Sequence, residues 1–396
     1  MHPGHAVSGT AGRTRTGKRP VLLAARNAHK ALLYAAALLD FDIRWLWPAA
    51  ENAGALCSCP ISAQMLTTAL QELIGQGSTP LLGSTSPARI IWAACRTSAA
   101  LSAVCDAHGV PLLVDNAHGA YLRFLPGEPL HPIALGAAMC CDSAHKTLPV
   151  VTGGAYLHLG ENAPVQEEAA VRGALALFGS TSPSYLILQS LDACNRQLTE
   201  SYPAGLQRCC ARLAALRGEL NAAAQAAGCP VPLALDGPGR EPLKLTLDAA
   251  ALGMTGTALA DALRGGQLEC EYADPRYVVL MFTPCNPPQD YARLRTVLRQ
   301  CLHGLPAAGG LLQPEELAGE FMALAQQARA HCTIRQAVFA PQERIPVQQA
   351  LGRICAMPTV SCPPAIPIAV SGEEITPAAL ELMQRYGVTE VSVLRR

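Results

Sequence analysis

Short apolar runs alternate with helix-like segments over the first half of the chain. Four such runs predict strands, at 21–25, 88–94, 111–114 and 153–159. The run at 111–114 is the kind found in a strand buried on both faces of a parallel sheet. Segments typical of helices lie at 67–77 and 98–108. This alternation of strands and helices predicts a doubly wound α/β domain.

The second half of the chain begins with a long helix rich in alanine, leucine and arginine, at 201–227, which is suited to linking domains. Beyond it, the strand-like segments EPLKLTL and YVVLMFTP flank a helix at 253–266 and predict a small α+β domain. A Gly/Pro/Leu stretch at 303–316 marks a further boundary. We therefore expect a large domain over 1–210, a small α+β domain over 211–305 and a carboxy-terminal domain over 317–396.

Composition and charge limit the kinds of protein that the chain can be and the partners that we expect for it. The chain has 396 residues, half of them hydrophobic, which suits two or three domains with large cores. Its 30 basic and 30 acidic residues balance, so charge gives no reason to expect nucleic acid or an anionic membrane as partner. No apolar run approaches the roughly 20 residues of a membrane span, and the basic opening segment lacks the apolar region of a signal peptide. We expect a cytoplasmic protein.

The 16 cysteines are scattered through Ala/Leu-rich segments, and adjacent pairs such as Cys140–Cys141 and Cys209–Cys210 lack metal-ligand spacing. They are most simply small hydrophobic residues in a reducing compartment. From this pattern we expect no metal site.

Two segments carry candidate chemistry. Asp115 closes the apolar run at 111–114, and Lys146 lies in a polar turn after a second short run. Because the carboxyl ends of strands meet at one edge of an α/β sheet, the acid and the amine are expected in one crevice. A lysine with Ser143 three residues upstream offers an amine for a Schiff base and a hydroxyl for a phosphate. Each residue alone also suits a plainer role, Asp115 as a helix cap and Lys146 as a surface lysine.

Six segments resemble, in the same order, the pyridoxal-phosphate enzymes of fold type I, and most closely the ornithine/lysine/arginine decarboxylase family. They are RNAHK (26–30), LLVDNAHGAY (112–121), DSAHKTLPVVTGGAYL (142–157), STSPSYLILQSLD (180–192), EPLKLTL (241–247) and CPPAIPIAVSGE (362–373). The resemblance implies an α/β fold in three parts: a large PLP-dependent transferase-like domain with a mostly parallel sheet, a small α+β domain and a carboxy-terminal decarboxylase-type domain.

The resemblance also implies roles for individual residues. Lys146 would bind pyridoxal 5'-phosphate covalently, Asp115 would keep its pyridine nitrogen protonated, and His29 would stack on the ring. Ala117 and His118 would lie beside the cofactor, with His118 bonded to the phenolic oxygen. For His29 the plainer alternative is a helix N-terminal residue without a cofactor role.

The remaining implied roles concern the phosphate and the reacting bond. Ser143 would hold the phosphate, and His145, the second catalytic residue beside Lys146, would lie next to the covalent link. Ser180 and Thr181 would reach the phosphate of a neighbouring subunit, which would make a homodimer necessary, although helix capping explains both residues equally well.

The implied activity is decarboxylation of arginine, lysine or ornithine to the amine and carbon dioxide, leading to a polyamine or diamine. Acidic groups, with Glu373 among the candidates, would meet the distal charge of the substrate. The alternatives are a catalytically weakened homologue acting as a binding or dimer-partner protein, and another fold-type-I enzyme such as an aminotransferase.

Three features depart from the family pattern, and the last two favour the weakened homologue. Ala31 stands where the family usually has serine, the substrate-side loop is reduced to ACRTSA, and only 25 residues precede RNAHK. Relatives place a phosphate loop there, for which Ser8 to Thr10 are the remaining candidates, so we expect looser cofactor binding.

Overall fold

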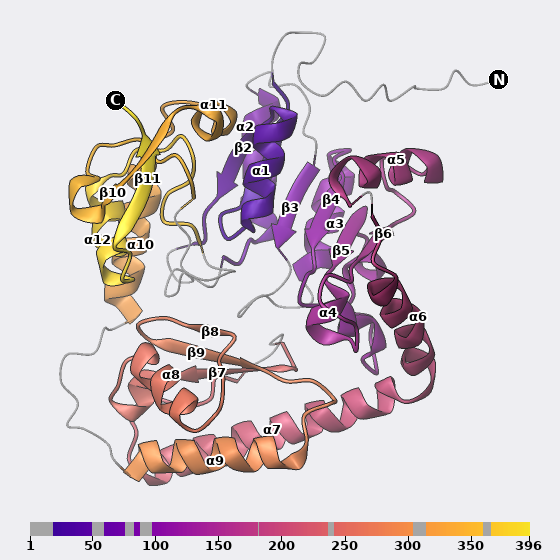
Figure 1. Ribbon diagram of the computed structural model, residues 1–396, viewed down its shortest axis with the longest axis vertical. Coiled ribbons are helices and arrows are strands. Elements are labelled where there is room, and N and C mark those ends of the chain that lie inside the picture. Colours follow the sequence, from indigo (N-terminus) through magenta and orange to yellow (C-terminus); the bar gives the residue numbers. More distant parts are fainter. Residues whose placement is uncertain are drawn as a thin grey trace.

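The computed structural model describes residues 19–49, 59–75, 83–87, 97–180, 182–236, 241–303, 314–358 and 366–396. Figure 1 shows a large sheet domain, a smaller sheet lying on two long helices, and a carboxy-terminal part beside the large sheet. No helix in the described ranges combines the length and the apolar character needed to span a membrane.

The large sheet has six strands in the order β2-β1-β3-β4-β5-β6. All neighbours pair in parallel except β5 and β6, which pair antiparallel and leave β6 at the edge. The strands are β1 (Val21–Ala25), β2 (Asp42–Leu46), β3 (Gly83–Pro87), β4 (Leu112–Asp115), β5 (Met139–Asp142) and β6 (Tyr156–Leu159). The predicted α/β fold with a mostly parallel sheet is thereby confirmed.

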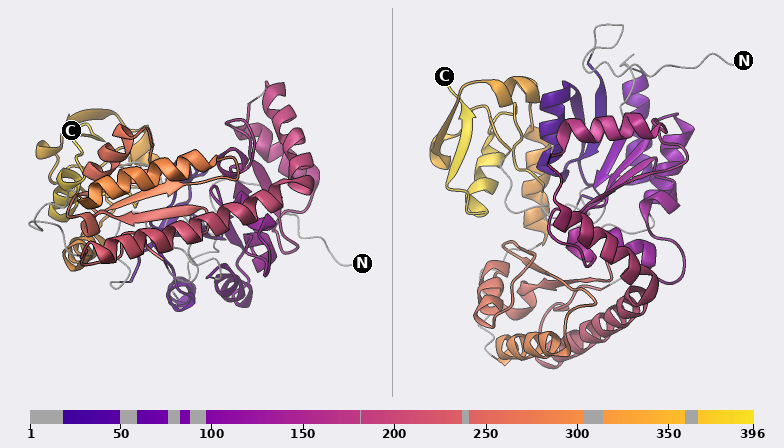
Figure 2. Two further views of the ribbon diagram at one scale, coloured as in Figure 1. Left: turned by 90° about the horizontal axis from the view of Figure 1, so that it is seen from below. Right: turned by 45° about the vertical axis from the view of Figure 1, so that its right-hand side comes forward.

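Alternate residues of the central strands face opposite layers of helices, because side chains of a strand point to its two faces in turn. Leu23 of β1 and Val114 of β4 belong to the same buried core as α2 (Ala63–Gly75) and α3 (Thr97–Ala107). On the other face, Leu22 packs against α1 (Lys30–Leu39). Figures 1 and 2 show α5 (Glu168–Phe178) and α6 (Tyr185–Glu200) beyond β6 at the side of this sheet.

A second core belongs to the smaller sheet, whose strand order is β7-β9-β8 with antiparallel pairing throughout. Its strands are β7 (Lys244–Asp248), β8 (Tyr272–Ala273) and β9 (Tyr277–Met281). The helices α7 (Tyr202–Ala226), α8 (Gly256–Gly265) and α9 (Pro288–His303) pack against it (Figure 2). The second core also contains Tyr121 and Leu148 of the large domain, so it continues to the site described below.

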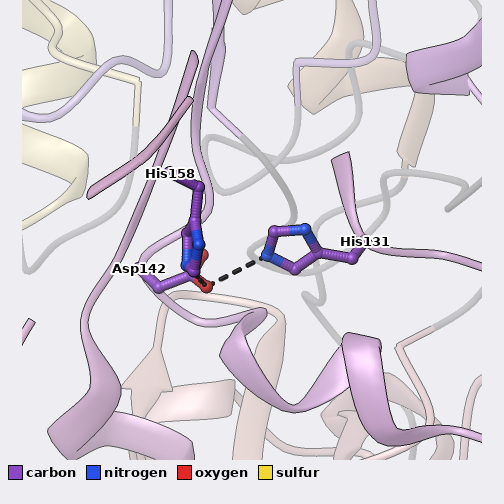
Figure 3. Close-up of side chains that lie close together, drawn as sticks. All are labelled: His131, Asp142 and His158. Atoms are coloured by element: carbon purple, nitrogen blue, oxygen red, sulfur yellow. Dashed lines mark hydrogen bonds and ion pairs between the residues drawn. The ribbon is translucent and has the colours of Figure 1, made fainter. Parts of the chain in front are cut away.

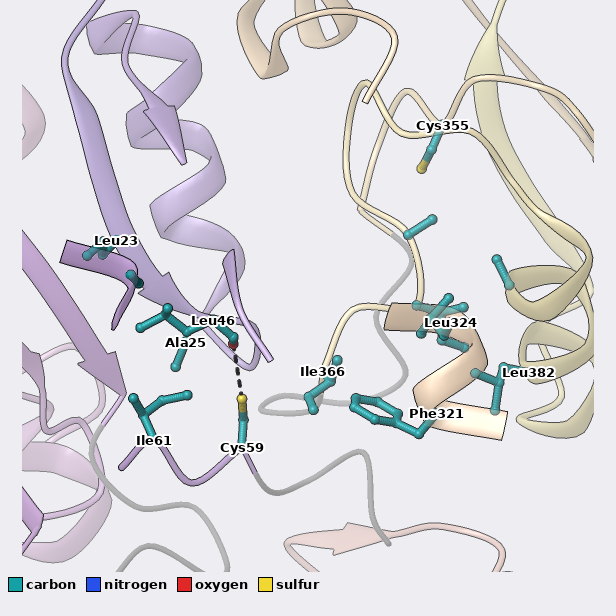
Figure 4. Packing of buried hydrophobic residues seen from close by; sticks show 14 of the residues in the cluster. Leu23, Ala25, Leu46, Cys59, Ile61, Phe321, Leu324, Cys355, Ile366 and Leu382 are labelled. Atoms are coloured by element: carbon teal, nitrogen blue, oxygen red, sulfur yellow. Dashed lines mark hydrogen bonds between the residues drawn. The ribbon is translucent and has the colours of Figure 1, made fainter. Parts of the chain in front are cut away.

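The carboxy-terminal part contains α10 (Pro314–Gln327), α11 (Ile334–Phe339), α12 (Pro377–Arg385) and the antiparallel pair β10 (Gln342–Pro346) and β11 (Glu390–Leu394). Its apolar side chains share one core with the large sheet. Figure 4 shows Ile61 and Cys59 on one side of that core and Ile366 and Phe321 on the other. The Trp47 and Phe321 rings meet edge to face with centroids 5.7 Å apart.

The observed strand boundaries show where the pattern of apolar residues was sufficient to predict a strand. The strand over 21–25 was predicted at its observed position, and β4 lies one residue beyond the predicted run at 111–114. The predicted strand over 88–94 lies outside the described residues, and the strand that the structure shows is β3, at Gly83–Pro87. The prediction over 153–159 was too long, because β6 spans only Tyr156–Leu159.

Candidate active site

Lys146 lies in a one-turn helix, α4 (Ala144–Thr147), directly after β5. Its Nζ is 2.9 Å from Nε2 of His118, which follows β4. Two neighbouring strand ends therefore bring a lysine amine and an imidazole into contact, as expected for the carboxyl edge of an α/β sheet.

The surroundings of His118 determine its protonation state. The side chain is 2% exposed, and its pKa is lowered to about 2, first by burial and then by the positive charges of Lys244 and Lys146. The imidazole is therefore neutral, and its Nε2 accepts a hydrogen bond from the Lys146 ammonium. Its Nδ1 is buried without a hydrogen-bond partner among the described residues, and Oε1 of Glu271 lies 3.9 Å away.

Asp115 ends β4 and forms a local turn. Its Oδ1 accepts the backbone N–H of Ala117 at 3.1 Å and lies 3.8 Å from Sγ of Cys141. Its Oδ2 has no hydrogen-bond partner within the part of the chain that the structure describes. Asp115 therefore forms a turn and caps no helix, because the next helix, η2 (Ala120–Phe124), has Gly119 as its N-cap residue. The second oxygen of Asp115 remains free for another donor.

His29 is the N-cap residue of α1, and its Nδ1 accepts the Ala31 backbone N–H at 3.2 Å. The pKa of the half-buried imidazole is lowered, mainly by burial; the Asp115 charge opposes this shift and the Lys146 charge adds to it. His29 and Asp115 line one cavity of about 280 Å³, together with apolar residues of β4, β5 and β6. The structure therefore brings together a flat imidazole, a carboxylate and the cluster around Lys146.

The turn around Lys146 also orients His145 and Ser143. Nδ1 of His145 lies 3.0 Å from the Gly154 carbonyl oxygen, so this nitrogen carries the ring proton and donates it. The backbone N–H of His145 bonds the same carbonyl at 3.2 Å. Ser143 precedes α4 as its N-cap residue, yet its hydroxyl makes no capping bond.

Ser180 is not brought to this cluster within one chain. Its hydroxyl bonds the Ser182 carbonyl oxygen and accepts the Ser182 N–H, both at 3.1 Å, in an exposed turn between α5 and α6. Thr181 and the candidate loop residues Ser8 to Thr10 lie outside the described residues.

Lys244 is a site residue that sequence reasoning missed. It begins β7, its side chain is buried, and burial lowers its pKa; Glu241 Oε2 lies 3.6 Å from its Nζ. The Lys244 charge acts on His118, and the Lys146 charge lowers the pKa of Lys244 further, so a second amine lies near the first. The available signal was the lysine in the centre of the apolar segment EPLKLTL.

Glu373, considered from the sequence as a possible substrate-binding acid, is already engaged. Both of its oxygens accept from the Arg26 guanidinium at 2.7 Å, and both side chains are buried. This bidentate pair engages both oxygens of Glu373 within the chain, so we do not propose Glu373 as a substrate-binding acid.

Solved structures with the same fold include lysine decarboxylases. The constitutive lysine decarboxylase of E. coli superposes with a TM-score of 0.70 at 18% identity, over 95% of this chain and 67% of that one. The lysine decarboxylase of Francisella novicida gives a TM-score of 0.71 at 16% identity, over 95% and 66%. At these identities the likeness establishes the fold.

Sequence comparison gives the family. An arginine decarboxylase of Bacillus subtilis is 31% identical over 276 residues, 67% of this chain, and the chain spans about half of that protein (54%). One from Bacillus anthracis is 26% identical over 289 residues, 71% of this chain and 56% of that protein. The family model for the Orn/Lys/Arg decarboxylase major domain matches residues 10–237, and the model for the carboxy-terminal domain matches 316–388. The chain therefore belongs to the Orn/Lys/Arg decarboxylase family.

Proposed function

We propose that this protein decarboxylates a basic amino acid, namely arginine, lysine or ornithine, and that pyridoxal 5'-phosphate is its cofactor. The observation that carries the proposal is the contact of Lys146 Nζ with His118 Nε2 at 2.9 Å, at the strand edge that also holds Asp115. Family membership selects decarboxylation among the reactions of fold-type-I enzymes.

The polar groups of this edge fit the cofactor. Asp115 has a free carboxylate oxygen for a protonated ring nitrogen, and His118 has a buried Nδ1 without a partner among the described residues. The cavity that His29 and Asp115 share, about 280 Å³, approaches the size of small-ligand sites. When bound, pyridoxal phosphate supplies an electron sink for the bond that breaks at the substrate α-carbon.

The chain's own residues would then hold and orient the reacting groups. Asp115 keeps a proton on the ring nitrogen through a charged hydrogen bond, and Lys146 supplies the amine for covalent attachment. Ser143 offers its uncommitted hydroxyl to the phosphate. His145 donates its Nδ1 proton to Gly154, which leaves Nε2 as the nitrogen able to accept or carry a proton beside Lys146.

Arginine is the substrate to test first, because the curated relatives above are arginine decarboxylases. We propose a homodimer in the cytoplasm, with Ser180 and Thr181 reaching the partner's phosphate. The cysteines support a cytoplasmic location, because each one in the described ranges carries a free thiol, as is usual in a reducing compartment. We also propose three domains, a large one over 1–210, a small α+β domain over 211–305 and a carboxy-terminal domain over 317–396.

Two measurements test the function. Purified protein is incubated with pyridoxal phosphate and arginine, lysine or ornithine, and carbon dioxide and the amine are quantified. We expect stoichiometric release of both products from one of the three. Production of a keto acid without carbon dioxide would instead identify an aminotransferase, and no product from any substrate would support a binding homologue.

The site assignment is tested by borohydride reduction in the presence of the cofactor, followed by peptide mapping. We expect the pyridoxyl group on Lys146, and its absence in Lys146→Ala. Lys244 is the natural internal comparison, because it is the second amine near His118. A label on Lys244 in the unmodified protein would overturn the assignment.

A further inference from the structure

His131, Asp142 and His158 form a compact group on the face of β5 opposite to Cys141. Asp142 ends β5, His158 lies on the neighbouring strand β6, and His131 precedes the short 3-10 helix η3 (Pro132–Leu135). His131 and Asp142 are buried, and His158 is half-buried. Figure 3 shows both imidazole rings directed at one carboxylate.

The geometry of the three ligand atoms suits one metal ion. Nε2 of His131 and Nε2 of His158 lie 3.0 and 2.9 Å from the same oxygen, Oδ2 of Asp142. All three atoms lie within 4.8 Å of one another. A tetrahedral zinc ion with bonds of about 2.0–2.1 Å separates its ligand atoms by about 3.3 Å, so small shifts of the side chains would complete the site.

The surrounding residues hold the carboxylate in place. Asn116 is fully buried and donates from Nδ2 to Oδ1 of Asp142 at 2.7 Å, so only Oδ2 faces the two imidazoles. Cys140 Sγ lies 3.5 Å from the same Oδ1. A hydrogen bond to the non-ligating oxygen of a carboxylate is the usual support of a metal ligand.

The group also has room for a further ligand. His131, Asp142 and His158 all line a cavity of about 830 Å³, together with Tyr156 and Asn195. The Tyr156 hydroxyl is buried and has no hydrogen-bond partner among the described residues. Three protein ligands with an open position form the arrangement that binds zinc together with a water molecule.

We propose that His131, Asp142 and His158 bind one divalent transition-metal ion of the zinc type. Two imidazoles and one carboxylate favour such an ion over magnesium or calcium, which prefer all-oxygen sites. Metal binding requires the Nε2 lone pairs, so each ring carries its proton on Nδ1 in the complex. The ion joins β5, the edge strand β6 and the segment before η3, and its ligand Asp142 directly precedes the turn that carries Lys146. The expectation that the chain holds no metal site rested on cysteine spacing alone and did not weigh histidine and aspartate ligands.

The test is metal binding by the whole chain, which does not depend on the proposed catalytic activity. Protein dialysed against a chelator is titrated with Zn²⁺ in a calorimeter and, separately, with Co²⁺ under an absorption spectrometer. We expect one equivalent of Zn²⁺ and a rise of the unfolding temperature on binding. The cobalt spectrum should show the visible bands of a tetrahedral site without a thiolate charge-transfer band.

Three variants test whether the metal binds at these particular residues. His131→Gln and His158→Gln should each weaken binding by about 100-fold or more, and Asn116→Ala by about 10–100-fold. His331→Gln is the matched control, because its imidazole pairs with Glu374 at 2.8 Å on the surface. The proposal is overturned if the native protein binds no Zn²⁺, if the cobalt spectrum shows thiolate ligation, or if folded His131→Gln and His158→Gln bind as tightly as the control.

Discussion

The neutral state of His118 is set by residues that are distant in sequence. Its imidazole is 2% exposed and faces the charges of Lys146 from α4 and Lys244 from β7, so adding a proton costs more in the folded chain than in water. A sequence pattern places His118 after a strand. It cannot supply the burial or the second lysine, which arise only when the small sheet packs beside the large one.

His118 should make the folded state sensitive to acid. Between pH 6.5, its ordinary pKa, and about 2, the unfolded chain binds a proton at this residue that the folded chain excludes. The free energy of unfolding therefore falls as the pH falls through this window, by at most about 1.4 kcal/mol per pH unit. We expect His118→Gln to reduce the slope measured by urea unfolding between about pH 6.5 and about pH 4.5.

Two comparisons isolate this contribution. His108→Gln is the matched control, because it removes a part-buried imidazole just after α3, whose Nδ1 lies 2.8 Å from the Val104 carbonyl oxygen and which takes no part in the cluster around His118. Burial raises the pKa of Asp142, but hydrogen bonds from its imidazole and amide partners lower it further, so the net shift is downward. The stabilisation that Asp142 adds to the folded state is therefore lost only below pH 3.8, the ordinary pKa of the carboxyl, which lies outside this window. Equal slopes in the His118 and His108 variants would contradict the argument.

Asp115→Asn should retain the cofactor but slow catalysis. Asparagine keeps the turn with the Ala117 N–H, since its side-chain oxygen also accepts, but it cannot hold a proton on the ring nitrogen. We expect kcat for the best substrate to fall by about 10²–10⁴-fold, the usual contribution of a positioned proton. Cofactor content is measured in parallel, and Asp106→Asn, a surface change on α3, is the control. Near-normal turnover would show that Asp115 serves only as a turn residue.

At the scale of elements, β1 and β3 show what the pattern of apolar residues can and cannot predict. Val21–Ala25 is apolar throughout, and this gave the strand its observed boundaries. Gly83–Pro87 has the sequence GSTSP, which has little intrinsic preference for a strand. It is a strand because β1 and β4 hydrogen-bond it from both sides, and this support depends on the assembled sheet.

The ion pair between Arg26 and Glu373 joins the end of β1 to the carboxy-terminal part. Arg26 is fully buried, its guanidinium lies 5.0 and 4.6 Å from the ring centroids of Trp45 and Trp47, and Glu373 also accepts the Val370 N–H at 3.0 Å. The pair therefore replaces the water that both charges lose on folding.

Glu373→Gln should destabilise the fold, because it leaves the Arg26 charge buried without its counter-ion. We expect the free energy of unfolding to fall by about 3–5 kcal/mol. Glu374→Gln next to it breaks an exposed pair with His331 and should cost at most about 1 kcal/mol. Chemical denaturation of both variants measures the difference, and similar small losses would show that the buried pair adds little.

At the scale of the whole molecule, one apolar core unites the large sheet with the carboxy-terminal part, while a second core holds the small sheet and reaches Tyr121 and Leu148. The Gly/Pro stretch and the long helix were the signals from which the domain boundaries were predicted. The sequence could not predict that His131, Asp142 and His158 converge, since 27 positions separate the first from the last. The antiparallel pairing of β5 with β6 brings Asp142 and His158 together, and the segment before η3 adds His131.

The α5–α6 region indicates how two chains would associate. No residue of α5 is buried, and Leu177, Phe178, Tyr185 and Leu186 are 80%, 63%, 81% and 65% exposed. Large apolar side chains gathered at one place on a surface mark an interaction site, because their contact with water is unfavourable. The turn of Ser180 lies between them, so an interface formed here would carry its hydroxyl toward a second chain.

We therefore expect the protein to be a dimer of twice the chain mass of 41.5 kDa and the double variant Leu177→Glu/Phe178→Glu to be a monomer. Burying two carboxylates in an apolar interface without partners costs several kcal/mol, enough to dissociate it at micromolar concentration. Light scattering after size-exclusion chromatography measures the masses. Ile74→Glu, an equally drastic change at an exposed position of α2, is the control and should remain dimeric. A dimer that survives the double variant would place the interface elsewhere and would remove the structural support for a role of Ser180 across subunits.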